Sequence, residues 1–273
     1  IIEIELTPNR GDCLGMEGIA REVATLNRRE FRLLPADAVP PVVDATFPVK
    51  LLDPADCPRY VGRVIRGVNP AAETPLWMQE RLRRAGVRSL GPLVDVTNYV
   101  MLELGQPMHA FDLGRLTGGI EVRRARPGDR LELLNGVVVE PDAETLLITD
   151  RAGPLALAGI MGGEISSCTD ATRDVFLESA FFTPSSIAGR ARRYGLQTDS
   201  SYRFERGVDS QVQRRATERA TRLLIDMAGG QPGPIVEAVS PEHLPAEPAI
   251  RLRPERLRKL LGMDVPAAEV EEI

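Results

Sequence analysis

The sequence predicts an α+β fold, in which a central domain of mixed or antiparallel β structure carries flanking helices and parts of neighbouring domains at both ends. Helical and strand-like segments follow one another without the regular βαβ repeat of a parallel sheet. Short apolar runs crowd residues 131–177, where strand signals dominate. Two stretches rich in proline, 34–58 and 232–248, are typical of linkers.

The amino-terminal part predicts a helix, a linker and a strand. Asp12 suits the N-cap of a helix whose apolar residues recur at i, i+4 and i+7, namely Ile19, Val23 and Leu26. Leu34–Pro58 predicts a linker that contains one strand and marks a domain boundary. Tyr60–Val68 is rich in Val and Ile and predicts a second strand.

The helix with the clearest ends is predicted next. Thr74 suits the N-cap, Pro75 the first helical position and Gly86 the position just past the end. Its core-facing residues would be Trp77 or Met78, Leu82 and Ala85.

A hairpin and further strands follow. Asn135-Gly136 separates Leu131–Leu134 from Val137–Val139 and predicts a type I′ turn, because both residues tolerate positive φ. Three other apolar runs predict strands, and they are Leu146–Thr149, Leu155–Ala158 and Val175–Leu177.

The carboxyl-terminal part predicts three helices. A long amphipathic helix is expected over Ser210–Ala228, ended by Gly229-Gly230. Its apolar face would consist of Val212, Ala216, Ala220, Leu223 and Met227. After the Pro232–Pro248 linker, Arg253–Leu261 predicts a short helix that ends at Gly262, and another helix is expected near Pro266.

Composition and charge exclude several classes of protein. The chain is 43% hydrophobic and 27% charged, and no run approaches the ~18 apolar residues of a membrane span. With no signal-like start, a cytoplasmic protein without a membrane partner is expected, and Ile1 in place of Met indicates a piece of a longer chain. Cys13, Cys57 and Cys168 lack metal-ligand spacing, which predicts reduced thiols and no metal site.

Charge alone predicts no nucleic-acid binding surface. The net charge is −5, which argues against binding through overall positive charge. Arginines nevertheless cluster within residues 63–88 and within 190–206. Each cluster is either a solvated surface or a track for phosphate groups.

The common catalytic motifs are absent from the sequence. Three other features are candidates for a functional site. Glycine-rich 159–163 is either a strand end approached by another backbone or the wall of a pocket. His109, in a loop, is either structural or catalytic. Glu178 lies in an apolar segment and needs a partner, either an arginine or a donor on a ligand.

Several blocks closely resemble the editing domain of the β subunit of bacterial phenylalanyl-tRNA synthetase. They cover nearly the whole chain in the family's order, and they are Thr7–Asp12, Asp95–Val100, Gly105–Asp112, Ala158–Gly163, Leu177–Phe182 and Thr198–Asp209. The tail from about Ile250 resembles the start of the next domain. The resemblance implies the remainder of a preceding domain at 1–38, an editing domain at 39–243 and a truncated start of the following domain at 244–273. The neighbouring parts would be winged-helix-like.

The resemblance also implies a function. The family attaches phenylalanine to its tRNA with ATP and Mg²⁺, mainly on an α subunit, in an (αβ)₂ heterotetramer. None of that synthetic chemistry is expected in this chain. The implied activity is hydrolysis of tyrosine wrongly attached to phenylalanine tRNA, with no cofactor. The alternative is a non-catalytic module of the same subunit, for structure or tRNA docking.

The resemblance assigns roles to individual residues. Glu178 would receive the para-hydroxyl of tyrosine, and Ala158 with Gly159 would line the ring pocket. His109, Thr97 and Asn98 would lie near the ester or the terminal adenosine, as the catalytic set. One departure from the family is Gly91, which stands where a polar residue is expected.

Overall fold

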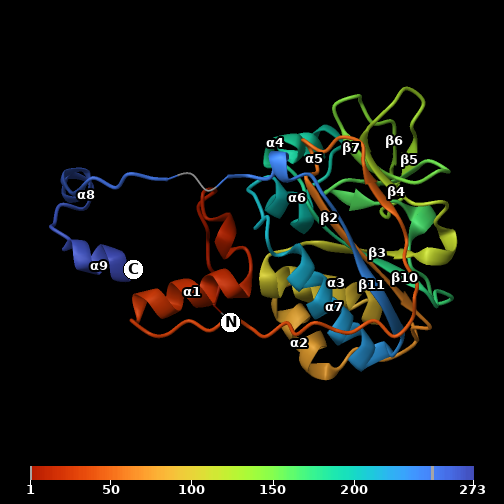
Figure 1. Cartoon of the computed structure of the whole chain (residues 1–273), viewed down its shortest axis with the longest axis horizontal. Coiled ribbons are helices and arrows are strands. Elements are labelled where there is room, and N and C mark those ends of the chain that lie inside the picture. The colour runs from red at the N-terminus through yellow and green to blue at the C-terminus, as the bar shows by residue number, and fades with distance from the viewer. Residues whose placement is uncertain (1, 247–248) are drawn as a thin grey trace.

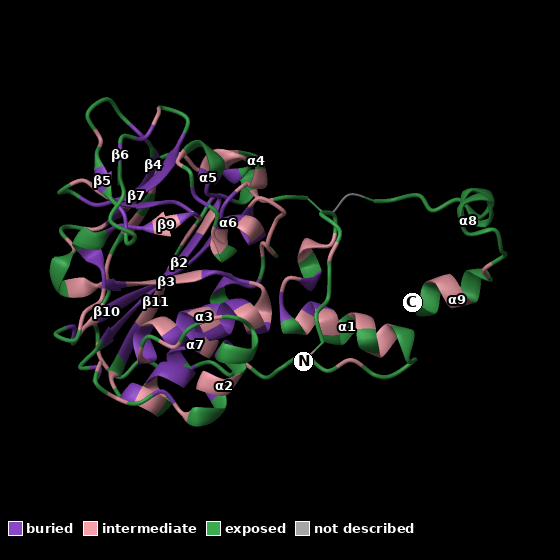
Figure 2. Cartoon of the chain, turned by 180° about the vertical axis from the view of Figure 1, so that it is seen from behind, coloured by how far each residue is buried: buried purple, intermediate pink, exposed green. Residues whose placement is uncertain are grey.

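The computed structural model describes residues 2–246 and 249–273, and its two larger sheets pack face to face with helices outside them (Figures 1 and 2). One sheet has the order β11-β2-β10-β3, built from β2 (Arg59–Arg66), β3 (Met108–Asp112), β10 (Val175–Phe181) and β11 (Gln231–Val239). The other has the order β1-β4-β7-β8-β9, built from β1 (Val49–Leu51), β4 (Ile120–Arg124), β7 (Leu146–Thr149), β8 (Pro154–Leu157) and β9 (Met161–Gly162). A hairpin joins β5 (Leu131–Glu132) to β6 (Val138–Val139).

The helices fall into three groups. On the outer face of the four-stranded sheet lie α2 (Leu76–Arg84), α3 (Pro92–Leu104) and α7 (Gln213–Ala228). Short helices close the other end of the body, and they are α4 (Pro184–Ile187), α5 (Arg190–Arg193) and α6 (Asp199–Phe204). The third group comes from the two ends of the chain, and it is α1 (Met16–Leu26), α8 (Pro254–Leu261) and α9 (Ala267–Glu272). No helix in the described ranges is both long enough and apolar enough to span a membrane.

Strand β10 is buried on both faces and divides the interior into two cores (Figure 2). Val175 and Leu177 pack with the helices, whereas Phe176 and Ala180 pack with the five-stranded sheet. This alternation follows from the two-residue period of a strand. Glu178 shares the face of Phe176 and Ala180, so its carboxyl group lies between the two sheets.

The predicted α+β class is confirmed, and several elements match the predictions closely. Helix α7 buries Ala216, Ala220 and Leu223 as expected, and it ends at Gly229, whose φ is 68°. The strand within the first linker is β1, and α8 begins at Pro254, the second residue of the predicted range.

The second predicted linker is wrong over its first eight residues, because Pro232–Val239 belongs to β11. Two prolines argued against a strand there, since proline cannot donate to a ladder. β11 lies at the edge of its sheet, and its register shifts between Pro232 and Ile235. An edge strand with a bulge accommodates proline where a central strand does not.

The predicted hairpin forms, but its turn is not type I′. That turn requires positive φ at both central residues, and among the described residues of this loop only Gly136 has it, at 78°. The Gly136 amide donates to Leu133 O (2.8 Å), and the Leu133 amide donates to Val137 O (2.9 Å). This is a type I turn followed by a bulge with glycine in the left-handed conformation.

Two predicted helix caps are also wrong. Asp12 lies in a separate 3₁₀ turn (η1, Gly11–Cys13), where it accepts two hydrogen bonds from Arg10, and α1 starts later at Met16. The Thr74 hydroxyl donates to Asp95 (2.6 Å) instead of capping, so Pro75 is the N-cap and α2 starts one residue late. In both cases a side-chain partner outside the helix removes the predicted cap.

The terminal segments differ in their contacts with the body. α1 packs on α3, and Glu17 of α1 forms an ion pair with Arg215 of α7. α8 and α9 project away from the sheets in Figure 1, and neither has a buried residue. Glu269 of α9 pairs with Arg28, just past the end of α1.

Candidate functional site

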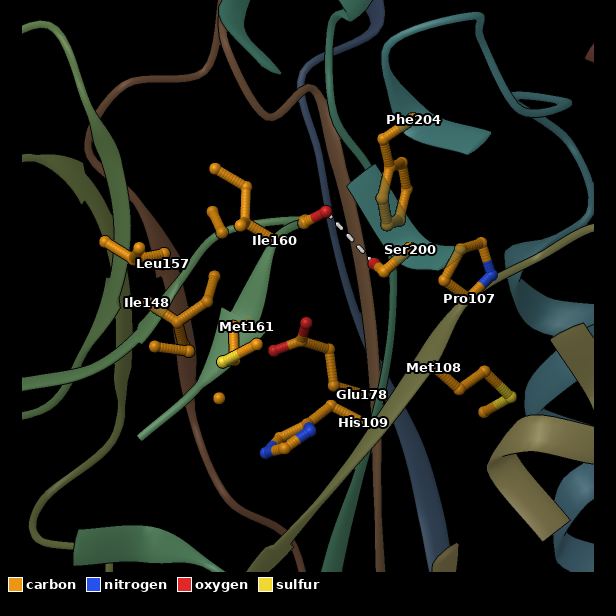
Figure 3. Close-up of a pocket in the computed structure, with 14 residues that line it drawn as sticks. Pro107, Met108, His109, Ile148, Leu157, Ile160, Met161, Glu178, Ser200 and Phe204 are labelled. Carbon is orange, nitrogen blue, oxygen red and sulfur yellow. Dashed lines mark hydrogen bonds between the residues drawn. The ribbon is translucent and has the colours of Figure 1, made fainter. Parts of the chain in front are cut away.

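A cavity of about 100 Å³ lies between the two sheets, beneath α6 (Figure 3). Its walls are mostly apolar, with two titratable side chains, His109 and Glu178, on one side. The apolar wall comes from Ile148, Ala156, Leu157, Ala158, Ile160, Met161 and Phe204. An apolar cavity with a few convergent polar groups is the usual form of a small-molecule site.

Strand pairing brings His109 and Glu178 together. β3 and β10 are antiparallel, and His109 lies directly opposite Glu178 in their register. Side chains of such a pair project from the same face of the sheet. The expectation that His109 lies in a loop is therefore wrong, because the chain enters β3 at Met108.

Glu178 is buried, with 8% of its surface exposed, and it has one protein partner. The Tyr60 hydroxyl donates to its Oε2 at 2.7 Å, whereas Oε1 has no hydrogen-bond partner among the described residues. No arginine pairs with this carboxylate in the described part of the chain, so the ion-pair alternative is wrong. Burial raises the pKa of Glu178 to about 7, against the lowering effect of the Tyr60 hydrogen bond.

Tyr60 acts as a neutral donor in this contact. Its ring is fully buried, and burial followed by the charge of Glu178 raises its pKa well above the usual value. A phenol that keeps its proton holds Oε2 in place and leaves Oε1 for another donor.

His109 is uncharged at neutral pH. Burial lowers the pKa of its imidazole to about 4. Its Nε2 is buried without a partner in the part of the chain that the structure describes, and the ring packs edge-on against Phe111 (centroids 4.4 Å apart). A buried polar atom without a partner costs free energy, and such atoms are common where a ligand or water completes the site.

Gly162 permits the position of His109. A Cβ at Gly162 would lie 2.6 Å from His109 Cε1 and 3.0 Å from Nε2. A side chain at this position therefore collides with the imidazole ring.

Gly162→Ala is expected to lower the free energy of unfolding by about 1–3 kcal/mol, because overpacking displaces His109. The double variant Gly162→Ala/His109→Ala removes the ring and should recover part of this loss. Urea denaturation measures both. If the free energy of unfolding of Gly162→Ala stays within about 0.5 kcal/mol of that of wild type, the imidazole of His109 moves aside without loss of stability.

The glycine-rich stretch 159–163 contributes one wall of the cavity, tied to α6. Ser200 Oγ donates to Gly159 O (3.0 Å), as Figure 3 shows, and Thr198 Oγ1 donates to Ile160 O (2.9 Å). Gly159 has φ of 67°, and a Cβ there would approach the rings of Phe182 and Phe204 to 3.0 Å. Glycine is therefore required where this turn meets α6.

The remaining predicted site residues lie on α3, outside the cavity lining. The Thr97 hydroxyl donates to Val94 O (2.8 Å) within the helix, and Asn98 is half-buried. α3 packs on the helix-covered side of the four-stranded sheet. Gly91, the departure from the family pattern, is the N-cap of α3 with φ of 111° and ψ of 163°, a conformation that strongly favours glycine.

Among the polar and aromatic residues of the site, sequence reasoning missed three. Tyr60 is one, because its contact with Glu178 depends on the pairing of β2 with β10 across more than a hundred residues. Ser200 and Phe204 are the others, and both belong to the recognised block Thr198–Asp209. The Thr198/Ser201 capping box that starts α6 was a signal in that block.

The site offers few ligands for a metal ion. His109 and Glu178 are the two metal-binding groups that line the cavity, fewer than the three protein ligands typical of catalytic zinc. Asp12, Cys13 and Glu22 also approach one another, but Arg10 donates hydrogen bonds to all three and supplies their positive charge.

The cavity suits an aromatic ring that carries a hydroxyl. Its apolar wall removes a ring from water, and Glu178 Oε1 can accept a hydrogen bond from the hydroxyl. Neutral His109 lies beside that carboxyl group.

Comparison with known proteins identifies the family. A profile of the B3/4 domain matches residues 56–229. The whole chain is 58% identical to 34% of the phenylalanine–tRNA ligase β subunit of Methylococcus capsulatus, and 55% identical to 35% of that of Hahella chejuensis. The chain thus spans about a third of the length of these relatives. A solved N-terminal fragment of the phenylalanyl-tRNA synthetase β subunit from Pyrococcus horikoshii aligns with 97% of this chain and 73% of its own, at 15% identity and a TM-score of 0.47. On the match over residues 56–229, the chain belongs to the B3/4 domain family.

Proposed function

We propose that this chain is part of a phenylalanine–tRNA ligase β subunit and that its cavity hydrolyses tyrosine wrongly attached to phenylalanine tRNA. The identity of 58% with such a subunit over the whole chain supports the first half. The observation that carries the second half is the buried carboxyl group of Glu178, with Oε1 unpartnered beside an apolar wall.

This arrangement favours tyrosine over phenylalanine, as the removal of wrongly attached tyrosine requires. An apolar synthetic pocket rejects a ring with one extra hydroxyl only about 10²-fold. A second site built around a hydroxyl acceptor can reject the analogue without the hydroxyl by ~10⁴–10⁵. Tyrosine would satisfy Glu178, whereas phenylalanine would leave its buried carboxyl group without a second partner.

The hydrolysis needs little from the protein, because an aminoacyl ester is already activated. The proposed task of the site is therefore to position the ester and one water molecule. With a pKa of about 4, His109 is a weak base at pH 7, so its proposed role is to orient water or ester through Nε2. Thr97 and Asn98, which lie outside the cavity lining, stay candidates for contact with the terminal adenosine of the tRNA.

The remaining expectations concern the whole enzyme. ATP and Mg²⁺ would serve aminoacylation, mainly on an α subunit, and the proposed hydrolysis uses neither. The proposed partners are that α subunit, in an (αβ)₂ heterotetramer, and phenylalanine tRNA, in the cytoplasm. Within the chain, residues 39–243 would form the editing domain between parts of its neighbours.

The test is deacylation of tyrosyl-tRNA and phenylalanyl-tRNA, both on phenylalanine tRNA, by the subunit assembled with its α partner. Wild type is expected to release tyrosine far faster than phenylalanine. Glu178→Ala should slow tyrosine release by about 10- to 100-fold, the value of a buried hydrogen bond to a charged group. Aminoacylation with phenylalanine should stay unchanged.

Glu140→Ala provides the control, because it removes a carboxylate from an exposed position outside the cavity. It should leave both deacylation rates unchanged. If an assembly that still charges phenylalanine releases no tyrosine, the domain is a structural or tRNA-docking module and the proposed function is wrong.

A further inference from the structure

A second hollow, of about 320 Å³, lies on the outer face of the five-stranded sheet. In β1 and β4 the apolar residues Val49, Ile120 and Val122 contribute to the core between the sheets. The alternate residues therefore point outward. The lining includes Lys50, Gly118, Glu121, Arg123, Arg126 and Arg151.

Three of the four cations in this lining are not held by a carboxylate at ion-pair distance in the described part of the chain. Lys50, Arg126 and Arg151 form no ion pair within the described ranges, whereas Arg123 is held by both oxygens of Asp129 (2.7 and 3.1 Å). Like charges that share a hollow repel one another unless an anion enters.

The acidic residues of the lining do not neutralise these cations. Both oxygens of Asp150 accept hydrogen bonds from backbone amides, of Thr117 (2.7 Å), Ala152 (2.7 Å) and Gly153 (3.2 Å). Glu121 is the one other acid in the lining, opposite Lys50 in the pairing of β1 with β4. Because Arg123 is paired with Asp129, three remaining cations against two carboxylates leave the lining positive.

The backbone holds Arg151 in this position. Its amide donates to Thr117 O (3.2 Å), and a Cβ at Gly118 would lie 3.1 Å from its Nε and 3.3 Å from its Cζ. Gly118 has φ of 81°, which favours glycine. The guanidinium therefore lies against a loop that has no side chain to displace it.

We propose that this hollow binds phosphate groups. Arginine presents a planar set of donors that matches a phosphate, and lysine adds a mobile positive charge. Ile148 lines the first cavity, and Thr149, the next residue of β7, pairs with Glu121 of this hollow. Neighbouring residues of a strand project from opposite faces, so the two sites lie on opposite faces of the sheet. The phosphate ligand is therefore bound apart from any amino acid in that cavity, and it is either a free polyphosphate compound or an RNA backbone.

The probe is inorganic tripolyphosphate, titrated into the full chain by calorimetry at low ionic strength. Saturable binding is expected, and Arg126→Gln and Arg151→Gln should each weaken it roughly tenfold. Glu121→Gln should strengthen it a few-fold, because it removes a negative charge from the lining. Circular dichroism verifies that each variant is folded.

Arg192→Gln is the matched control, because it removes an exposed arginine on α5 that lies outside this hollow and forms no ion pair with any described residue. It should leave binding unchanged. No saturable binding by wild type, or equal weakening by Arg192→Gln, overturns the proposal.

Competition with a short single-stranded RNA distinguishes the two sources of phosphate. If the RNA displaces tripolyphosphate and Arg151→Gln weakens both, the hollow takes a nucleic-acid backbone. If tripolyphosphate binds and the RNA does not compete, it takes a free phosphate compound. Neither result depends on tyrosine hydrolysis, so this proposal and the proposed function fail separately.

Discussion

Glu178→Gln is expected to raise the free energy of unfolding at pH 8 by roughly 3 kcal/mol relative to wild type. The carboxyl group has a pKa of about 7 in the folded protein and an ordinary value of 4.5. Each pKa unit corresponds to about 1.4 kcal/mol of difference between the two protonation states. An amide carries no charge into the cavity and still accepts the hydrogen bond from Tyr60.

The sign of the pH dependence follows from the raised pKa. Between pH 4.5 and 7 the folded chain keeps the proton on Glu178 and the unfolded chain loses it. The folded state therefore binds more protons, and its stability falls as pH rises through this interval. The gain from Glu178→Gln should be small at pH 5 and complete at pH 8.

Urea denaturation at pH 5 and pH 8 measures this gain. Glu140→Gln removes the same charge from an exposed position and should change stability by less than about 0.5 kcal/mol at both values. An equal gain from Glu178→Gln at both pH values would mean that burial does not perturb this carboxyl group.

The expected gain bears on why Glu178 is a glutamate. A residue that lowers the stability of the fold at neutral pH is not explained by packing. Functional sites often keep such residues at the expense of stability. The same substitution that stabilises the fold is therefore expected to weaken recognition of tyrosine, since an amide accepts the phenolic hydrogen bond less strongly than a carboxylate.

Local patterns predicted the elements whose residues act on near neighbours. The stripe and terminal glycines of α7, and the ends of α8, depend on contacts within a few residues. β11 was missed because proline signals are local, whereas the edge position that tolerates proline depends on the whole sheet. The cap at Thr74 failed for the same reason, because Asp95 of α3 binds its side chain, whereas the cap at Asp12 failed through a near neighbour, Arg10.

The candidate site, like the fold, was predictable only in part. Recognised blocks pointed to His109 and Glu178, and the register of β3 with β10 brings them to one cavity. The partner of Glu178 was not predictable, because Tyr60 lies on β2, which pairs with the other side of β10. A single sequence does not state which distant strands pair.

Arg63→Met is expected to destabilise the protein by about 3–5 kcal/mol, the usual effect of breaking a buried ion pair from one side. Arg63 lies on β2 with 1% of its surface exposed. Its guanidinium donates to Glu218 of α7 (2.8 Å), to Val39 O (2.6 Å) and to Gly233 O of β11 (2.8 Å). Without it, Glu218 keeps a buried charge with no counter-ion.

The double variant Arg63→Met/Glu218→Leu should recover only part of this loss. Apolar replacement of a buried ion pair is often neutral. Here Glu218 also accepts the Val39 amide (2.8 Å), so the double variant leaves backbone groups of Val39 and Gly233 without partners. Each buried, unpaired group costs about 1–3 kcal/mol.

Arg66→Met is the matched control, because Arg66 lies on the same strand and pairs with Asp174 at the surface. Its loss should cost less than about 1 kcal/mol. Urea denaturation compares the three variants, and limited proteolysis should show earlier cleavage near Val39 in Arg63→Met, since that segment loses its attachment to β2. If Arg63→Met lowers the free energy of unfolding no more than Arg66→Met does, the Arg63–Glu218 pair does not hold the segment around Val39 to the four-stranded sheet.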